Sequence, residues 1–184
     1  MDQPELDKLI LRLKEERLFG RANGGGLDAA RKPGVDLLLA IHTLDWSVET
    51  LLEKLTELSK KPAQSFRTAE RNHVPEQNGV YVIFEADRCI YVGRSRNLRR
   101  RLLGDHRVGG NSQFRYDVGL YRGLVPTHEP KDAYRTNQEY KEDITGYVWS
   151  RCSFVFSAIE PSQRTSEFEN IARWALQPEF NPWP

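Results

Sequence analysis

The sequence predicts an α+β fold: a small antiparallel sheet of three strands, flanked by helices and preceded by an all-helical N-terminal region. Apolar residues recur at helical spacing in residues 6–13 and 48–58, and again in residues 165–176. Residues 79–93 instead alternate with a period of two, and residues 152–159 form another apolar segment of strand length. Helical and strand patterns thus occupy separate parts of the chain, as in α+β proteins.

Residues 1–61 are predicted to form the helical N-terminal region. A glycine-rich break at residues 20–26 separates its first helix from two others, at residues 35–42 and from Asp45 to Leu58. The last helix presents acids spaced four apart, which would repel phosphate: Glu49, Glu53 and Glu57. We therefore interpret this region as a packing or dimerisation element, with a homodimer as one expected assembly and DNA contact as the alternative.

Residues 62–77 show no apolar period, so we interpret them as a linker between two domains. The second domain then comprises residues 78–184, with an insert at residues 108–150. The insert begins with glycines, is polar in its middle and is expected to hold a short helix near residues 113–120. We interpret the insert either as a DNA-recognition element or as a polar surface loop.

A β-hairpin is predicted from residue 79 to residue 93. If its apolar sets share one face, residue 82 must pair with residue 92 and residue 83 with residue 91. This register requires an odd loop at residues 86–88 or a bulge, and it groups Ile90 with Val92. The same register places Tyr81 and Tyr91 together on the opposite face, so burial of the core and clustering of the tyrosines require one and the same hairpin.

A helix is expected directly after the hairpin, with Ser95 as its N-cap. Leu98 and Leu102 lie four residues apart and would pack on the sheet. Residues 152–159 supply the third strand, and residues 165–176 supply a closing helix that Pro178 prevents from continuing.

Positive charge is concentrated rather than general in this chain. The 184 residues carry a formal net charge of only +1. Between residues 88 and 107, however, there is a single acid, Asp105, among arginines 88, 94, 96, 99, 100, 101 and 107. Such a cluster is typical of surfaces that bind phosphate, although a solvated helix face is the alternative interpretation.

The cysteines and the hydropathy exclude several classes of protein. Cys89 and Cys152 have no partner at zinc-ligand spacing, so no zinc site is expected. No apolar run approaches the 18 residues of a membrane helix, and the first residues are acidic and basic rather than those of a signal peptide. We therefore expect a cytoplasmic protein without a membrane partner.

Short motifs in the hairpin and after it resemble those of the GIY-YIG nuclease superfamily. They are Gly79-Val80-Tyr81, Tyr91-Val92-Gly93, a Ser-x-Asn-Leu-x-x-Arg run ending at Arg101, a late Glu169, and Phe180-Asn181. The resemblance covers residues 79–181, and its specificity lies in the order of the motifs, since each alone is short. It implies a metal-dependent endonuclease that uses water as nucleophile and leaves a 3′-hydroxyl and a 5′-phosphate.

The resemblance assigns catalytic roles to Tyr81, Tyr91, Arg101, His106, Glu169 and Asn181. Tyr81 and Tyr91 would be active-site phenols that orient water or accept its proton. Arg101 would hold the scissile phosphate. Glu169 would bind Mg²⁺ (or Mn²⁺), which needs few protein ligands, and Asn181 would order the site. Some restriction enzymes of the superfamily use a histidine after the helical arginine in proton transfer, which makes His106 a candidate.

Four of these residues also have a structural interpretation. The tyrosines are common strand residues. Ser166 and Glu169 have capping-box spacing, so Glu169 would then cap its own helix, and Glu167 becomes a second candidate metal ligand. Asn181 precedes a proline and would then form a turn at the end of the chain.

Double-stranded DNA is the expected partner, with RNA as an alternative substrate. The residues expected to contact nucleic acid are Arg94, Arg96, Arg99, Arg100, Arg107 and Arg115. A nuclease domain with its own insert favours a restriction-type enzyme. A component of DNA repair, a non-catalytic nucleic-acid-binding module and a structural scaffold are the alternatives.

Overall fold

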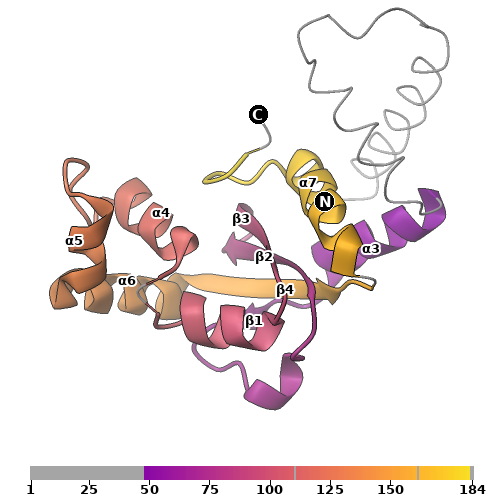
Figure 1. Ribbon diagram of the computed structural model, residues 1–184, viewed down its shortest axis with the longest axis horizontal. Coiled ribbons are helices and arrows are strands. Elements are labelled where there is room, and N and C mark those ends of the chain that lie inside the picture. Colours follow the sequence, from indigo (N-terminus) through magenta and orange to yellow (C-terminus); the bar gives the residue numbers. More distant parts are fainter. Residues whose placement is uncertain (1–47, 110, 161, 183–184) are drawn as a thin grey trace, which may run out of the picture.

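The computed structural model describes residues 48–109, 111–160 and 162–182. The helices expected at residues 6–13 and 35–42, and the start of the next helix at Asp45, lie outside the described residues. The described part is α+β, as predicted, with one antiparallel sheet and several helices (Figure 1).

The sheet has four strands rather than the predicted three. They are β1 (Gln64–Ser65), β2 (Gly79–Glu85), β3 (Arg88–Ser95) and β4 (Cys152–Ala158), in the order β1-β4-β2-β3. All neighbours are antiparallel. The prediction missed β1 because two residues cannot display a period; this strand exists through its pairing with Phe154 and Ser153 of β4.

The segment expected as a linker, residues 62–77, contributes to the core. It contains β1 and a short 3-10 helix, η1 (Arg71–His73). Phe66 and Val74 are fully buried among the side chains under the sheet. The segment is therefore folded against the sheet over its described length.

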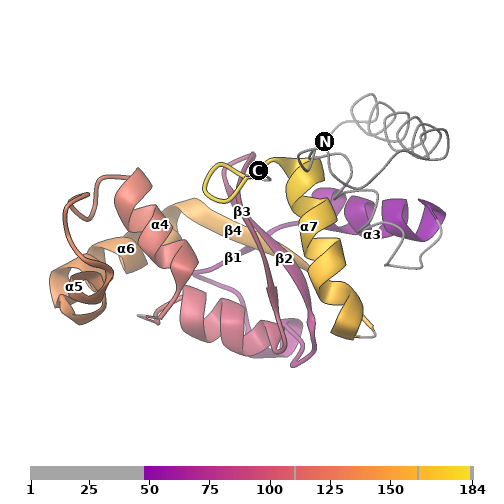
Figure 2. The same cartoon turned by 45° about the horizontal axis from the view of Figure 1, so that its top comes forward.

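Each face of the sheet has its own apolar core. On one face, α3 (Val48–Lys60) and α7 (Thr165–Leu176) bury leucines and Phe168 against Val82 of β2. The other face is covered by η2 (Arg100–His106), α4 (Gln113–Tyr121) and α6 (Gln138–Arg151), with α5 (Lys131–Thr136) beyond them. Figures 1 and 2 show α3 and α7 at one side of the sheet and α4–α6 at the other.

The predicted hairpin register is confirmed. Val82 pairs with Val92, and Ile83 pairs with Tyr91. The turn itself has only two residues, Ala86 and Asp87, with Ala86 at a positive φ of 51°. A bulge between Ile83 and Phe84 supplies the odd residue instead.

This bulge corrects one expectation about the apolar sets. Phe84 pairs with Cys89, so Ile90 is the extra residue on β3. As a result Ile90 packs with Ile83 on the tyrosine face, whereas Val92 packs on the opposite face. Ile90 and Val92 therefore do not share a core.

The helices confirm most of the sequence expectations. The closing helix α7 spans Thr165–Leu176 as predicted, and the insert holds α4 near the expected position. The helix after the hairpin is capped by Asn97, not by Ser95: the Asn97 Oδ1 accepts a hydrogen bond from the Arg100 amide at 2.8 Å. Ser95 lies in the turn before it and accepts from the Asn97 amide. Among the described residues, no helix is long and apolar enough to cross a membrane.

Candidate functional site

Tyr81 and Tyr91 lie side by side on the sheet face that η2 covers. Their ring centroids are 6.4 Å apart and nearly parallel. His106 completes the group: its Nε2 lies 2.6 Å from the Tyr81 hydroxyl, and its ring is edge-on to both tyrosines. The structure thus brings together three of the predicted site residues, from two strands and a helix.

The glycines of the two hairpin motifs make this group possible. A Cβ at Gly93 would lie 2.4 Å from the Tyr81 hydroxyl oxygen and 2.9 Å from the Tyr91 ring. A Cβ at Gly79 would lie 2.3 Å from the Ser157 carbonyl oxygen and 2.8 Å from Leu98. Gly93 therefore leaves room for the tyrosine pair, and Gly79 lets the helix after the hairpin approach the sheet.

The helix that carries Arg101 and His106 is a π-helix over Arg100–His106. In an α-helix, residues five apart are separated by about 140° around the axis and point away from each other. In a π-helix the hydrogen bonds join residues five apart, so residue i+5 returns toward the face of residue i. The π-helix therefore turns Arg101 and His106 toward the same tyrosines, although five positions separate them and an α-helix would point them apart.

Burial and neighbouring charges fix the protonation of the group. Burial, together with the nearby Tyr91, raises the pKa of Tyr81 well above 10. Burial raises the pKa of Tyr91 to about 12. Burial, followed by the charges of Arg101 and Arg115, lowers the pKa of His106 well below 6.5. At neutral pH both phenols are therefore protonated and the imidazole is neutral, so that one ring nitrogen can accept the hydrogen bond of the Tyr81 hydroxyl.

Ser112 is a member of the group that the sequence did not reveal. Its Oγ lies 2.7 Å from His106 Nδ1 and also accepts a hydrogen bond from the Arg115 amide, because Ser112 is the N-cap of α4. The hydroxyl is buried. The insert is thereby joined directly to the imidazole, a contact that no spacing in the sequence could indicate.

Arg101 lies at the edge of this group. Its guanidinium makes an ion pair with Asp105 at 3.2 Å, while its Nε is buried without a hydrogen-bond partner. Its charge lowers the pKa values of Tyr81, Tyr91 and His106. Arg101 therefore lies within electrostatic range of all three rings.

Glu169 lies on α7, the helix that packs against β3. Its side chain is 19% exposed and makes an ion pair with Arg94 Nε at 3.0 Å. Burial raises the pKa of Glu169, while Arg94 and Arg173 lower it. Its charge in turn raises the pKa values of Tyr81 and Tyr91. Glu169 is thus a half-buried carboxylate within electrostatic range of the two tyrosines.

The capping-box interpretation of Glu169 does not fit the structure. The helix begins at Thr165, and its N-cap residue, Arg164, makes no side-chain capping hydrogen bond. The alternative ligand Glu167 has a buried Oε2 without a hydrogen-bond partner. Within the described ranges, no three acidic, histidine or cysteine side chains are grouped as a metal cage. A cation at Glu169 would therefore depend on one carboxylate, which suits Mg²⁺ because this ion keeps waters and binds substrate phosphate.

Asn181 contacts the backbone of β3 rather than the rings. Its Oδ1 accepts from the Val92 amide at 3.1 Å, and its Nδ2 donates to the Val92 carbonyl at 2.6 Å. The preceding residues Glu179 and Phe180 also donate their amides to β3 carbonyls. Asn181 thus closes the open edge of the strand that carries Tyr91, and it orders the site from behind.

The predicted nucleic-acid-binding arginines divide into two groups. Arg96 and Arg100 are exposed, and within the described part of the chain their side chains make no hydrogen bond or ion pair. Arg94 is exposed but paired with Glu169. Arg99 instead donates to the Val74 carbonyl and pairs with Glu76. The exposed arginines, Arg94, Arg96 and Arg100, are available to an external anion. Arg99 instead holds the segment before the hairpin.

Arg107 and Arg115 are also structural. Arg107 donates to the carbonyls of Arg67 and Ala69 and lies over the Trp149 ring. Arg115 is fully buried and donates to the backbone carbonyls of His106 in η2 and Lys141 in α6. The prediction that Arg115 contacts nucleic acid does not fit this burial. It failed because a helical pattern cannot show that the guanidinium turns inward to bridge two helices.

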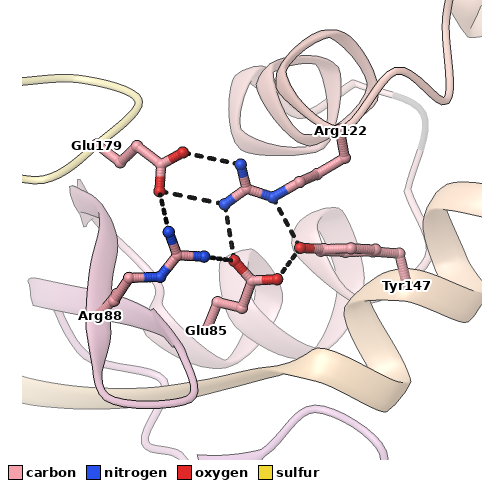
Figure 3. Close-up of polar contacts among 5 residues, drawn as sticks. All are labelled: Glu85, Arg88, Arg122, Tyr147 and Glu179. Carbon is pink, nitrogen blue, oxygen red and sulfur yellow. Dashed lines mark hydrogen bonds and ion pairs between the residues drawn. The ribbon is translucent and has the colours of Figure 1, made fainter.

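A second polar cluster joins the hairpin turn, the insert and the C-terminal segment (Figure 3). Arg122 binds Glu85 at 2.7 Å and Glu179 at 2.8 Å, and its Nε donates to the Tyr147 hydroxyl. The hydrogen bonds that Arg122 donates to Glu179 raise the pKa of Arg122. Hydrogen bonds from Tyr147 and Arg122 outweigh burial and lower the pKa of Glu85. Arg88 completes the cluster, which is internally compensated and therefore structural.

No family model, curated protein or solved structure matches this chain. The function of this chain is therefore inferred from its residues and from their geometry.

Proposed function

We propose that this chain is a metal-dependent DNA endonuclease, which hydrolyses a phosphodiester bond at the tyrosine, histidine, arginine and glutamate group. One observation carries the proposal: a neutral, buried His106 is hydrogen-bonded to Tyr81, with Arg101 and Glu169 in electrostatic range. A base, a cation and a carboxylate within electrostatic range of one another are the parts that phosphodiester hydrolysis requires.

His106 is the proton acceptor in this proposal. The raised pKa values of the tyrosines make them poor bases by themselves. Tyr81 is a better relay: it receives the proton of the attacking water while its own hydroxyl proton passes to His106 Nε2. The water oxygen bonds to phosphorus, the bond to the 3′ oxygen breaks, and this oxygen takes a proton from solvent.

Arg101 and Glu169 have separate roles. Arg101, with an unpartnered buried Nε, would hold the scissile phosphate and offset the negative charge that develops on it. Glu169 would hold Mg²⁺ or Mn²⁺, which when bound polarises the phosphate and lowers the pKa of its waters. The burial that raises the pKa of Glu169 would be offset by such a cation.

The test is incubation of the purified protein with supercoiled plasmid and phage DNA, in Mg²⁺, in Mn²⁺ and in EDTA. Glu169→Ala should abolish cleavage, while the exposed Glu160→Ala should leave it unchanged; Glu167→Ala tests the second candidate ligand. Discrete fragments would support a restriction-type enzyme. Nicking or smearing would point to a structure-dependent or non-specific nuclease, as in DNA repair.

A second function, nucleic-acid binding without cleavage, is favoured by one observation. Arg94 Nε lies 3.0 Å from the Glu169 carboxylate and makes an ion pair with it. A metal ion at Glu169 would have to displace this guanidinium. Tight, salt-sensitive binding of DNA with no cleavage in either metal would establish this alternative and reject the enzyme.

A further inference from the structure

A polar groove of about 510 Å³ lies beside Arg101, between η2 and the insert. Its charged lining consists of Arg100, Arg101, Lys131, Arg135 and a single acid, Asp105. Lys131 and Arg135 are four residues apart on α5 and therefore share a helical face. The insert thus adds two cations to the side of the candidate site that the hairpin motifs do not reach.

Amide side chains at the start of α4 hold these two cations in place. Gln113 Oε1 accepts a hydrogen bond from Lys131, and Asn111 Oδ1 accepts one from Arg135 at 3.0 Å. The other end of Gln113 donates to Asp117 at 2.6 Å. Lys131 also lies over the Tyr116 ring. Both ends of the Gln113 amide and the Asn111 carbonyl are thus hydrogen-bonded within the protein. Positive charge is therefore the main feature that the groove offers to a ligand.

The negative charge within the groove is smaller than the positive charge. Asp105 already pairs with Arg101 at 3.2 Å. The Arg101 Nε is nevertheless buried without a hydrogen-bond partner, and Arg100 is exposed at the mouth of the groove. Asp105 therefore does not neutralise the cations of the groove, and an anionic oxygen bound there would form charge-assisted hydrogen bonds with them.

We infer that this groove binds a backbone phosphate of the nucleic acid, next to the phosphate held at Arg101, and that Lys131 and Arg135 are its ligands. The inference depends on the proposed function and names how the insert takes part in it. Because the amides are engaged, the contact is to the sugar-phosphate backbone and is independent of base sequence.

The experiment measures binding of the full-length protein to two fluorescent DNA duplexes of unrelated sequence, in EDTA, over a range of salt concentrations. The variant is Lys131→Ala with Arg135→Ala. Two controls are matched to it: Lys54→Ala with Lys60→Ala removes two charges on α3, at the opposite side of the sheet, and Lys131→Arg with Arg135→Lys keeps the charge. Circular dichroism verifies that each variant is folded.

The double alanine variant should bind both duplexes more weakly by the same factor. Its plot of log affinity against log salt should be shallower by about 0.9, the slope expected for one lost phosphate contact. Both controls should match the wild type. An unchanged slope, or a loss confined to one duplex, would overturn the inference.

Plasmid cleavage separates this inference from the proposed function. If the wild type cleaves DNA and the variant has the wild-type salt slope, only the groove assignment is wrong. If the wild type neither binds nor cleaves DNA, both are wrong. If the wild type binds without cleavage and the slope falls as expected, the groove assignment holds and the protein is a binding module.

Discussion

The Tyr81 hydroxyl lies 2.6 Å from His106 Nε2, although 25 positions separate the two residues in the sequence. Three local features produce this contact. Gly93 leaves space for the phenol, Leu98 and Leu102 anchor the helix on the sheet, and the π-helix turns His106 inward. A polar pair in a dry environment is costly unless both partners are satisfied, which makes the pair sensitive to small changes around it.

Gly93→Ala should destabilise the protein and displace Tyr81. The added Cβ would lie 2.4 Å from the Tyr81 oxygen, so the ring or the strand must shift. Overpacking of this kind costs about 1–3 kcal/mol. Urea unfolding measures the change.

The matched control is Gly146→Ala, on α6, where a Cβ would meet nothing within 4 Å. Because alanine favours a helix, this variant should be more stable by about 0.4–1 kcal/mol. Equal stabilities of the two variants would show that the tyrosine pair is not tightly packed.

Acidification should destabilise the protein through His106. Its pKa is lowered in the folded state, so below pH 6.5 the unfolded chain binds a proton that the folded chain does not. Stability from this group is therefore full above pH 6.5 and falls as the pH decreases, by up to about 1.4 kcal/mol per pH unit. Urea unfolding at several pH values between 7.5 and 5 measures the slope.

His106→Asn gives the comparison, because asparagine does not titrate. The difference in stability between this variant and the wild type should shrink as the pH falls. A difference independent of pH would show that the imidazole is not held neutral.

Ser112→Ala should lower kcat and leave KM nearly unchanged. The serine fixes the imidazole through Nδ1 but lies behind it, away from any substrate. Without the hydroxyl the orientation and tautomer of His106 are no longer fixed, and the acid limb of the pH–rate profile should shift. The lost N-cap also costs about 1 kcal/mol of stability.

Ser112→Thr retains the hydroxyl and should restore most of kcat. A similar fall in kcat for both variants would mean that Ser112 matters only for packing at the start of α4.

Arg122→Ala should destabilise the domain by about 2–4 kcal/mol. The side chain is 18% exposed and joins Glu85 to Glu179, which would be left close together without their shared partner. Thermal unfolding measures the loss, and it should grow as the pH rises above the range where both carboxylates ionise.

Lys54→Ala is the control for Arg122. Lys54 pairs with Glu57 on an accessible helix face, and such pairs contribute about 0–1 kcal/mol. If the two substitutions had equal effects, the cluster in Figure 3 would be no more than a surface ion pair.

The sequence determined the hairpin, its register and the closing helix, because these follow from local periodicity. A period of two fixes which residues of β2 and β3 share a face, so the pairing of Val82 with Val92 and the closeness of Tyr81 to Tyr91 could be predicted. The helical face of residues 165–176 placed Phe168 and Ile171 in the core for the same reason.

Only the tertiary structure decided which polar side chains serve the site. Ser112 reaches His106 from another element, Arg115 turns inward to bridge helices, and the two-residue strand β1 exists only because β4 pairs with it. The physical reason is that hydrogen bonds and burial act between segments that are distant in sequence, whereas periodicity records only which side of its own helix or strand a residue occupies.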